Sequence, residues 1–86
     1  MKREILLHKD AEKFLVKADS KTFKRITAVL SNLAEIPPIG DIKPLQNSKQ
    51  VFRARIGQYR IIYRIEEDVI LVRDIDARGQ IYKGVQ

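Results

Sequence analysis

The hydrophobic period of this sequence changes at Val51, and that change constrains the fold more than any other feature. Before Val51, apolar residues recur at spacings of three and four, as one face of a helix requires. After Val51 they alternate with polar residues, as in a strand with one buried face. Helices followed by strands are typical of an α+β fold, in which the helices cover one face of a mostly antiparallel sheet. The 86 residues fit a single domain, 1–86.

The predicted order of elements is β-α-α-β-β-β. A short strand is expected over residues 3–8, followed by a helix capped by Asp10 and a second helix capped by Ser20. Together the helices form a hairpin that packs on one face of the sheet. The next stretch contains Pro37, Pro38, Gly40 and Pro44, which predict a loop that is neither helix nor central strand. The helical hairpin is long enough to serve as a crossover, so the first strand is expected to pair parallel to a later one.

The three later strands are expected over residues 51–56, 59–66 and 69–75. Gly57-Gln58 is a two-residue turn with glycine first, as a type II′ hairpin requires, and Glu67-Asp68 is a second candidate turn. The first turn fixes the register and therefore the faces. One face, directed at the helices, contains Phe52, Ala54, Ile56, Tyr59, Ile61 and Tyr63. The other contains Arg53, Arg55, Arg60 and Arg64, and a two-residue second turn would place Arg73 opposite Ile62 on this same surface.

This register predicts a conflict of charge, because Arg55 lies directly opposite Arg60. Like charges in that position destabilise a sheet by up to about 1 kcal/mol. A phosphate between the two guanidinium groups would turn the repulsion into an attraction, and arginine binds phosphate through two parallel hydrogen bonds. Six of the eight arginines fall in residues 51–86, whereas eight of the nine lysines fall in residues 1–50. The second half therefore predicts an anion-binding face; a solvated face without a ligand is the alternative.

Composition excludes several classes of protein. The absence of cysteine rules out disulfide scaffolds and cysteine-ligated metal sites, and the single histidine leaves no histidine cluster for a metal. No signal sequence or membrane span is recognisable, so a cytoplasmic protein is expected. The net charge of +6 favours a polyanionic partner such as nucleic acid, the ribosome or an acidic protein.

The hairpin carries a specific motif, Arg-x-Arg-x-Gly-x-Tyr-Arg, within residues 51–63. This segment resembles the central hairpin of RelE/ParE-superfamily toxins. Residues 68–72, Ala77-Arg78 and residues 81–83 resemble the last strand and the C-terminal motif of that family, and residues 40–45 match its layout. The resemblance covers nearly the whole chain.

The resemblance implies a toxin of a toxin–antitoxin pair, on the RelE-like branch, that cleaves mRNA in the ribosomal A site and inhibits translation. It implies that Arg53, Arg55 and Arg60 hold the scissile phosphate, that Arg78 lies near the leaving oxygen, and that Tyr82 activates the attacking hydroxyl or stacks on a base. We expect catalytic roles for Arg60, Arg78 and Tyr82, and RNA contacts from Arg53, Arg55, Arg64, Arg73 and Lys83. No metal or other cofactor is expected, and operator DNA would be bound only through the antitoxin complex.

Two departures from RelE stand out. RelE has lysines where this chain has Arg53 and Arg55, and this chain ends four residues after Tyr82.

Two other functions remain open: a ParE-like toxin that inhibits DNA gyrase without cleaving RNA, and a non-catalytic RNA- or ribosome-binding module. Among the acidic residues, Asp74 and Asp76 are candidates for orienting the arginines or acting as a base, although turn or salt-bridge roles are the simpler interpretation.

Overall fold

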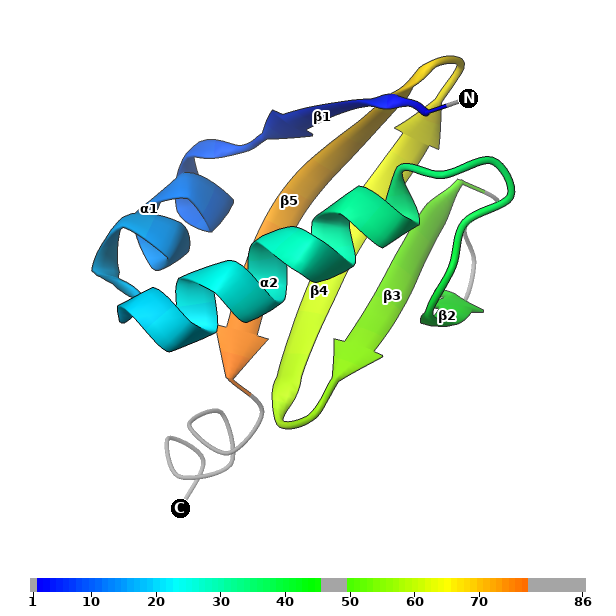
Figure 1. The fold of residues 1–86 in the computed structure, drawn as a ribbon. Coiled ribbons are helices and arrows are strands. Elements are labelled where there is room, and N and C mark those ends of the chain that lie inside the picture. Colours follow the sequence, from blue (N-terminus) through cyan, green and yellow to red (C-terminus); the bar gives the residue numbers. More distant parts are fainter. Residues whose placement is uncertain (1, 46–49, 78–86) are drawn as a thin grey trace.

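The computed structural model describes residues 2–45 and 50–77. Two helices, α1 (Lys9–Lys17) and α2 (Ser20–Leu33), lie against a sheet of five strands (Figure 1). The strands are β1 (Glu4–Leu7), β2 (Asp41–Pro44), β3 (Val51–Ile56), β4 (Tyr59–Glu66) and β5 (Val69–Ala77), in the spatial order β1-β5-β4-β3-β2. The α+β class is confirmed, and so is the parallel pairing of the first strand, which lies beside β5. All other strand pairs are antiparallel.

One strand was not expected from the sequence. Residues 41–44, predicted as loop, form the edge strand β2 and pair with β3. Pro44 is compatible with this position because an edge strand has one side on which no ladder hydrogen bond is needed. With only Ile42 as a non-proline apolar residue, the segment has no alternation long enough to reveal a strand.

Both helices begin earlier than the predicted caps. His8 caps α1, its Nδ1 accepting a hydrogen bond from the backbone N–H of Asp10 at 3.3 Å. Asp19 caps α2, its Oδ1 accepting from the backbone N–H of Thr22 at 2.8 Å. The predicted caps, Asp10 and Ser20, lie inside the first turns. Asp19 and Ser20 are adjacent residues of the preferred capping types, and the first of them caps α2, whereas His8 is not a preferred N-cap residue.

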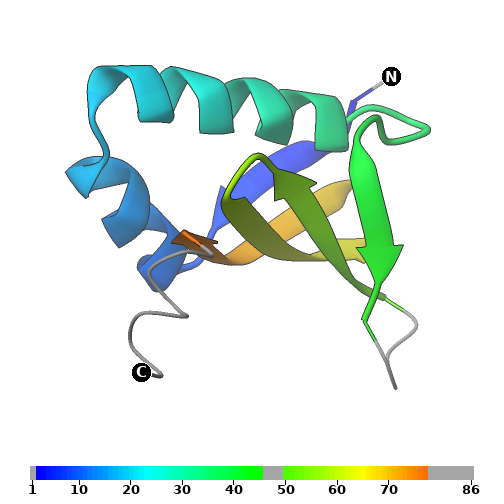
Figure 2. The same ribbon diagram turned by 90° about the horizontal axis from the view of Figure 1, so that it is seen from below.

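The hairpin register is confirmed at all six predicted pairs, from Ile56 opposite Tyr59 to Val51 opposite Arg64. The face directed at the helices supplies Ala54, Ile61 and Tyr63 to the core, all of them at most 1% exposed. Tyr63 stacks on Phe52 with ring centroids 5.7 Å apart, and Tyr59 meets Phe14 of α1 edge to face at 5.9 Å. Figure 2 shows α2 crossing this side of the sheet. The opposite side of β3 and β4 is covered by none of the described helices.

The predicted pairing of Arg73 with Ile62 is wrong. A β-bulge interrupts the pairing of β4 with β5 between Ile62 and Tyr63, so Tyr63 lies opposite Val72 while Ile62 lies opposite Asp74. Arg73 is the extra residue of the bulge and has no partner residue on β4. The second turn does have two residues, since Glu66 pairs with Val69, but a turn sets the register only as far as the next irregularity.

The described helices are too short or too polar to cross a membrane; the longer of them, α2, has 14 residues.

The backbone at the two hairpin turns is unusual, because φ is +57° at Gly57 and +51° at Glu67. Gln58 does not share the positive φ, which agrees with type II′ and excludes type I′. Glycine adopts a positive φ freely, whereas the Cβ of Glu67 is crowded in this conformation.

Replacing Glu67 with glycine is expected to stabilise the protein by about 0.5–1 kcal/mol, because the crowding is removed while glycine loses somewhat more entropy on folding. The hydrogen bond from Arg3 Nε to the backbone oxygen of Glu67, 3.2 Å long, does not depend on the side chain. Urea unfolding of Glu67→Gly measures the effect. Asp68→Gly is the control, since φ is not positive at Asp68. A Glu67→Gly variant no more stable than the control would contradict the expectation.

Candidate phosphate-binding face

The side of β3 and β4 that points away from the helices carries Arg53, Arg55, Arg60 and Arg64, and we call it the arginine face. The confirmed register places all four there, because residues at alternate positions of a strand share a side. Arg55 is exposed, and the other three are partly exposed. The predicted convergence of arginines from two neighbouring strands is therefore present.

Arg55 and Arg60 lie in the middle of a row of four charged residues that crosses the sheet. Asp41 on β2 is opposite Arg55, Arg55 is opposite Arg60, and Arg60 is opposite Asp76 on β5. The predicted opposition of Arg55 and Arg60 is confirmed. A carboxylate flanks the pair at each end and offsets part of the repulsion.

The next row is more mixed, with Lys43, Arg53, Ile62 and Asp74 in order across the same strands. The two rows together hold four cations and three carboxylates. The cations occupy β2, β3 and β4, and two of the carboxylates lie on β5. The arginine face is thus positive along β3 and β4, and the strands on either side of it, β2 and β5, contribute carboxylates.

The arginines differ in how far the protein itself neutralises them. Arg64 Nε lies 3.0 Å from Glu66 Oε1, in an ion pair. In the described part of the chain, no carboxylate oxygen lies within 4.0 Å of a guanidinium nitrogen of Arg53, Arg55 or Arg60. Arg60 Nε is also buried without a hydrogen-bond partner there. A buried donor without a partner is costly, and Arg60 therefore favours an acceptor close to its guanidinium group.

The carboxyls of Asp74 and Asp76 interact with each other on β5, and Asp76 lies opposite Arg60. Burial raises the pKa of Asp76, and the charge and hydrogen bond of Asp74 raise it further, while Arg60 acts in the opposite direction. The sequence alone leaves open whether Asp74 and Asp76 orient arginines or serve as a base. The bulge at Arg73 decides their position, since it brings Asp74 opposite Ile62.

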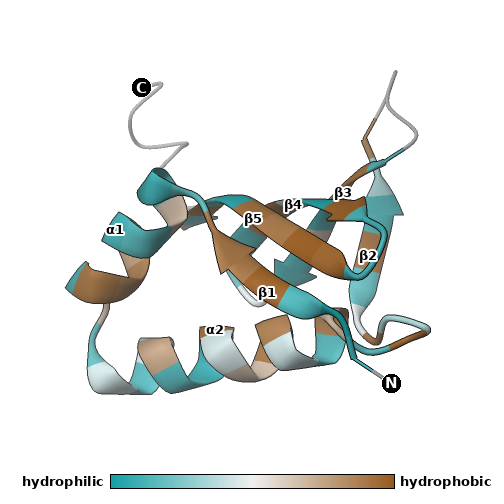
Figure 3. Cartoon of the chain, turned by 90° about the horizontal axis from the view of Figure 1, so that it is seen from above, coloured by the Kyte–Doolittle hydropathy of each residue, from teal (hydrophilic) through white to brown (hydrophobic). Residues whose placement is uncertain are grey.

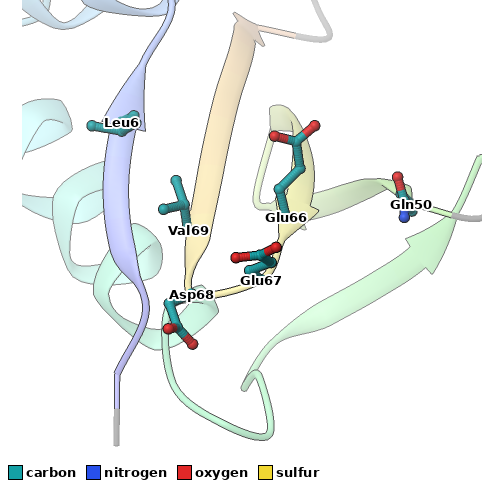
Figure 4. A pocket seen from close by; sticks show the side chains of 6 residues that line it. All are labelled: Leu6, Gln50, Glu66, Glu67, Asp68 and Val69. Atoms are coloured by element: carbon teal, nitrogen blue, oxygen red, sulfur yellow. The ribbon is translucent and has the colours of Figure 1, made fainter.

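The other end of this side of the sheet is acidic. An open hollow of about 640 Å³ is lined there by Leu6, Val69, Gln50 and the turn residues Glu66, Glu67 and Asp68 (Figure 4). Like charge disfavours a phosphate at this end. A bound polyanion is therefore confined to the hairpin end, where Arg55 and Arg60 lie.

Tyr63 and Tyr59 do not serve the arginine face. Tyr63 is 0% exposed, and burial raises the pKa of its hydroxyl to about 12. The hydroxyl of Tyr59 lies 3.4 Å from that of Thr22 in α2, and this hydrogen bond lowers the pKa of Tyr59 on the helix side of the sheet. Both tyrosines pack against the helices, as predicted from the alternation. His8, the single histidine, caps α1.

Three predicted site residues, Arg78, Tyr82 and Lys83, lie outside the described residues. Within the described ranges, no group of three His, Asp or Glu side chains is arranged to hold a metal ion. Asp41 and Lys43 were not predicted to lie on the same side as the arginine face, because the hydrophobic pattern of residues 41–44 does not indicate a strand.

Asp76→Asn is expected to stabilise the folded protein at pH 7. A raised pKa means that the folded state holds the ionised carboxylate less favourably than the unfolded state does. The destabilisation is present above the folded-state pKa and disappears as the pH falls through it, so the advantage of Asn should shrink in acid. Urea unfolding of both proteins between pH 7 and pH 3 tests this expectation. A destabilised Asp76→Asn protein at pH 7 would show instead that attraction to Arg60 dominates.

Comparison with known proteins agrees with this geometry. Residues 5–82 match the family described as ParE toxin of type II toxin-antitoxin system, parDE. RelE1 of Methanocaldococcus jannaschii, assigned as a toxin, is 31% identical over an alignment of 89 residues that covers 98% of this chain and 99% of that protein.

Two solved complexes contain chains with the same fold. The toxin of the archaeal RelE–RelB complex from Pyrococcus horikoshii has a TM-score of 0.77 at 25% identity, covering 93% of this chain and 99% of that one. The RelB–RelE complex from Methanococcus jannaschii gives 0.72 at 25% identity, covering 94% and 99%. The chain belongs to the RelE/ParE superfamily of toxins of type II toxin–antitoxin systems.

Proposed function

We propose that this toxin is an endoribonuclease that cleaves mRNA in the ribosomal A site and thereby inhibits translation. The observation that carries the proposal is the set of three guanidinium groups, Arg53, Arg55 and Arg60, that share one face without an ion pair in the described part of the chain. Relatives solved as RelE–RelB complexes support a cognate antitoxin as the partner that holds the toxin inactive. Operator DNA would be contacted through the antitoxin.

The chemistry suited to this face is attack of a ribose 2′-hydroxyl on the neighbouring phosphate. The new bond joins the 2′ oxygen to phosphorus, and the bond to the 5′ oxygen of the next nucleotide breaks. Negative charge accumulates on the phosphoryl oxygens, where Arg53, Arg55 and Arg60 would stabilise it. Positioning of the message by the ribosome would supply the orientation.

The proton transfers are assigned to groups near this phosphate. Arg78 would lie at the leaving oxygen and Tyr82 at the attacking hydroxyl, as the family resemblance implies. The other two tyrosines, Tyr59 and Tyr63, pack on the helix side of the sheet and are not available to this phosphate. Nearby guanidinium groups would lower its pKa, because positive charge favours a phenolate. Asp76 is a second proton acceptor, one strand from Arg60.

Gyrase inhibition is the alternative, and the match to a ParE toxin family favours it. Binding of gyrase would need a docking surface and no phosphate chemistry. The two functions therefore differ in their products: new 5′ ends in mRNA for the nuclease, and trapped gyrase–DNA complexes for the inhibitor.

Arg60→Ala is expected to lower mRNA cleavage about a hundredfold, because removal of one group that stabilises the developing charge typically costs that much. Primer extension on mRNA after induction in cells, scored together with growth, measures it. Lys17→Ala is the control, because Lys17 is an exposed cation in the last turn of α1, on the helix side of the sheet. Equal cleavage by the two variants would exclude the role given to Arg60, and trapped gyrase complexes without new mRNA ends would favour the alternative.

The family-based assignments have their own test in Arg78→Ala and Tyr82→Phe. Both variants should fold like the wild type and lose cleavage. Unaltered cleavage by Tyr82→Phe would leave Asp76 as the candidate base.

Affinity for single-stranded RNA should depend on salt through the same arginines. Each phosphate contact contributes about 0.7 to the slope of log affinity against log salt. Arg55→Ala should therefore reduce that slope by about 0.7. Filter binding to a fully 2′-O-methylated oligonucleotide, which cannot be cleaved, isolates binding from chemistry. Lys17→Ala should keep the wild-type slope, and an unchanged slope for Arg55→Ala would place the RNA elsewhere.

A further inference from the structure

The tip of the β3–β4 hairpin is held by side chains from both helices. Tyr59, the first residue of β4, meets the ring of Phe14 on α1 with centroids 5.9 Å apart, and its hydroxyl lies 3.4 Å from that of Thr22 on α2. These contacts fix the β4 end of the tip. The turn residue that follows β3, Gly57, is contacted by a different residue of α2, Arg25.

The guanidinium group of Arg25 lies directly on Gly57. A Cβ atom at position 57 would be 2.6 Å from Nη2 of Arg25, 3.3 Å from its Cζ and 3.5 Å from its Nη1. A separation below 3.0 Å is shorter than Cβ atoms tolerate, so any other residue at position 57 would displace the guanidinium group. The turn therefore requires glycine for two separate reasons, the positive φ and the close approach of Arg25.

Arg25 reaches the turn because of its place on α2. Ile26 and Leu30 are buried in the core, whereas Thr22 and Arg25, three residues apart, share the side of the helix that borders the hairpin tip. Figure 3 shows hydrophobic and hydrophilic segments alternating along this helix. Among the described residues, no carboxylate oxygen lies within 4.0 Å of a guanidinium nitrogen of Arg25. Its contact with the turn therefore does not compete with an ion pair there.

The hairpin tip lies beside two charges that repel each other. Arg55 is two residues before Gly57 and Arg60 three residues after it, and the two arginines are paired across the strands. Like charges in directly opposite positions destabilise the pairing, and here they act to separate the ends of β3 and β4. Only one further residue pair lies between them and the turn. A turn that is fixed to α2 by Arg25 resists this separation.

We propose that Arg25 is a positioning residue for the arginine face, because its contact with Gly57 fixes the hairpin tip to α2 and so sets the separation of the Arg55 and Arg60 guanidinium groups. The inference deepens the proposed function and rests on it, since a set separation matters where two guanidinium groups stabilise the charge on one phosphate. In this role Arg25 acts through the other two arginines and does not touch the RNA.

Arg25→Ala should lower the maximal rate at which the purified toxin cleaves ribosome-bound mRNA about tenfold, because a small misplacement of groups at the reacting phosphate is enough for such a loss. The toxin concentration that gives half the maximal rate should stay within about twofold of the wild type. Arg25→Met keeps a long side chain without the charge and should restore most of the rate. Lys24→Ala is the matched control, since Lys24 is the neighbouring exposed cation of α2.

Gly57→Ala tests the same contact from the other side. The added Cβ displaces the guanidinium group, so the rate should fall at least as far as in Arg25→Ala. The double variant should cleave at the rate of Gly57→Ala alone, because one contact can be lost only once. The positive φ at position 57 makes alanine unfavourable with or without Arg25, and urea unfolding measures that separate effect.

A readout without RNA separates this inference from the nuclease. Amide hydrogen exchange at Ile56 and Tyr59, the last pair before the turn, should become about tenfold faster in Arg25→Ala and stay at the wild-type rate in Lys24→Ala. Unchanged exchange in Arg25→Ala would overturn the proposal. So would a loss of about 0.7 from the salt slope for the 2′-O-methylated oligonucleotide, which would make Arg25 a direct phosphate contact. A wild-type protein that cleaves no RNA would refute the nuclease, while the exchange rates would still show whether Arg25 holds the hairpin tip.

Discussion

The pairing of β3 with β4 is the constraint on which the rest of the structure depends. Ala54, Ile61 and Tyr63 are buried against the helices, and a shift of one residue would send all three to the open side. The same burial forces Arg53, Arg55 and Arg60 onto the opposite side. The hydrophobic effect therefore assembles the arginines, which would not gather by themselves because they repel one another.

The cost of gathering these charges is partly offset within the fold. Asp41 and Asp76 flank the two opposed arginines, yet no ion pair closes on Arg53, Arg55 or Arg60 among the described residues. The carboxylates lower the repulsion without occupying the guanidinium groups, and an anion can still bind. Arg64 is different, because Glu66 already neutralises it and the acidic β4–β5 turn follows directly. RNA contact is therefore less favourable at Arg64 than at the other three arginines.

The two sides of the sheet differ in chemistry. The arginine face is cationic, whereas the helix side has exposed apolar side chains at Ile5, Val16 and Phe23. Membership of the superfamily does not decide between RNA and gyrase as target, since function resides in the site and the fold is shared. Arg53, Arg55 and Arg60, which have no ion pair among the described residues, are the observation that favours RNA over gyrase as the proposed target.

The sequence by itself determined the α+β class, the parallel first strand and the register of the central hairpin. It did so because hydrophobic period and a two-residue turn are local properties that act over a few residues. Tertiary structure decided what depends on partners distant in the sequence. Residues 41–44 became a strand because the edge of β3 was available, and a bulge in β5 replaced Arg73 by Asp74 opposite Ile62. The row of Asp41, Arg55, Arg60 and Asp76 likewise exists only once β2, β3, β4 and β5 have paired, since no single one of these strands contains it.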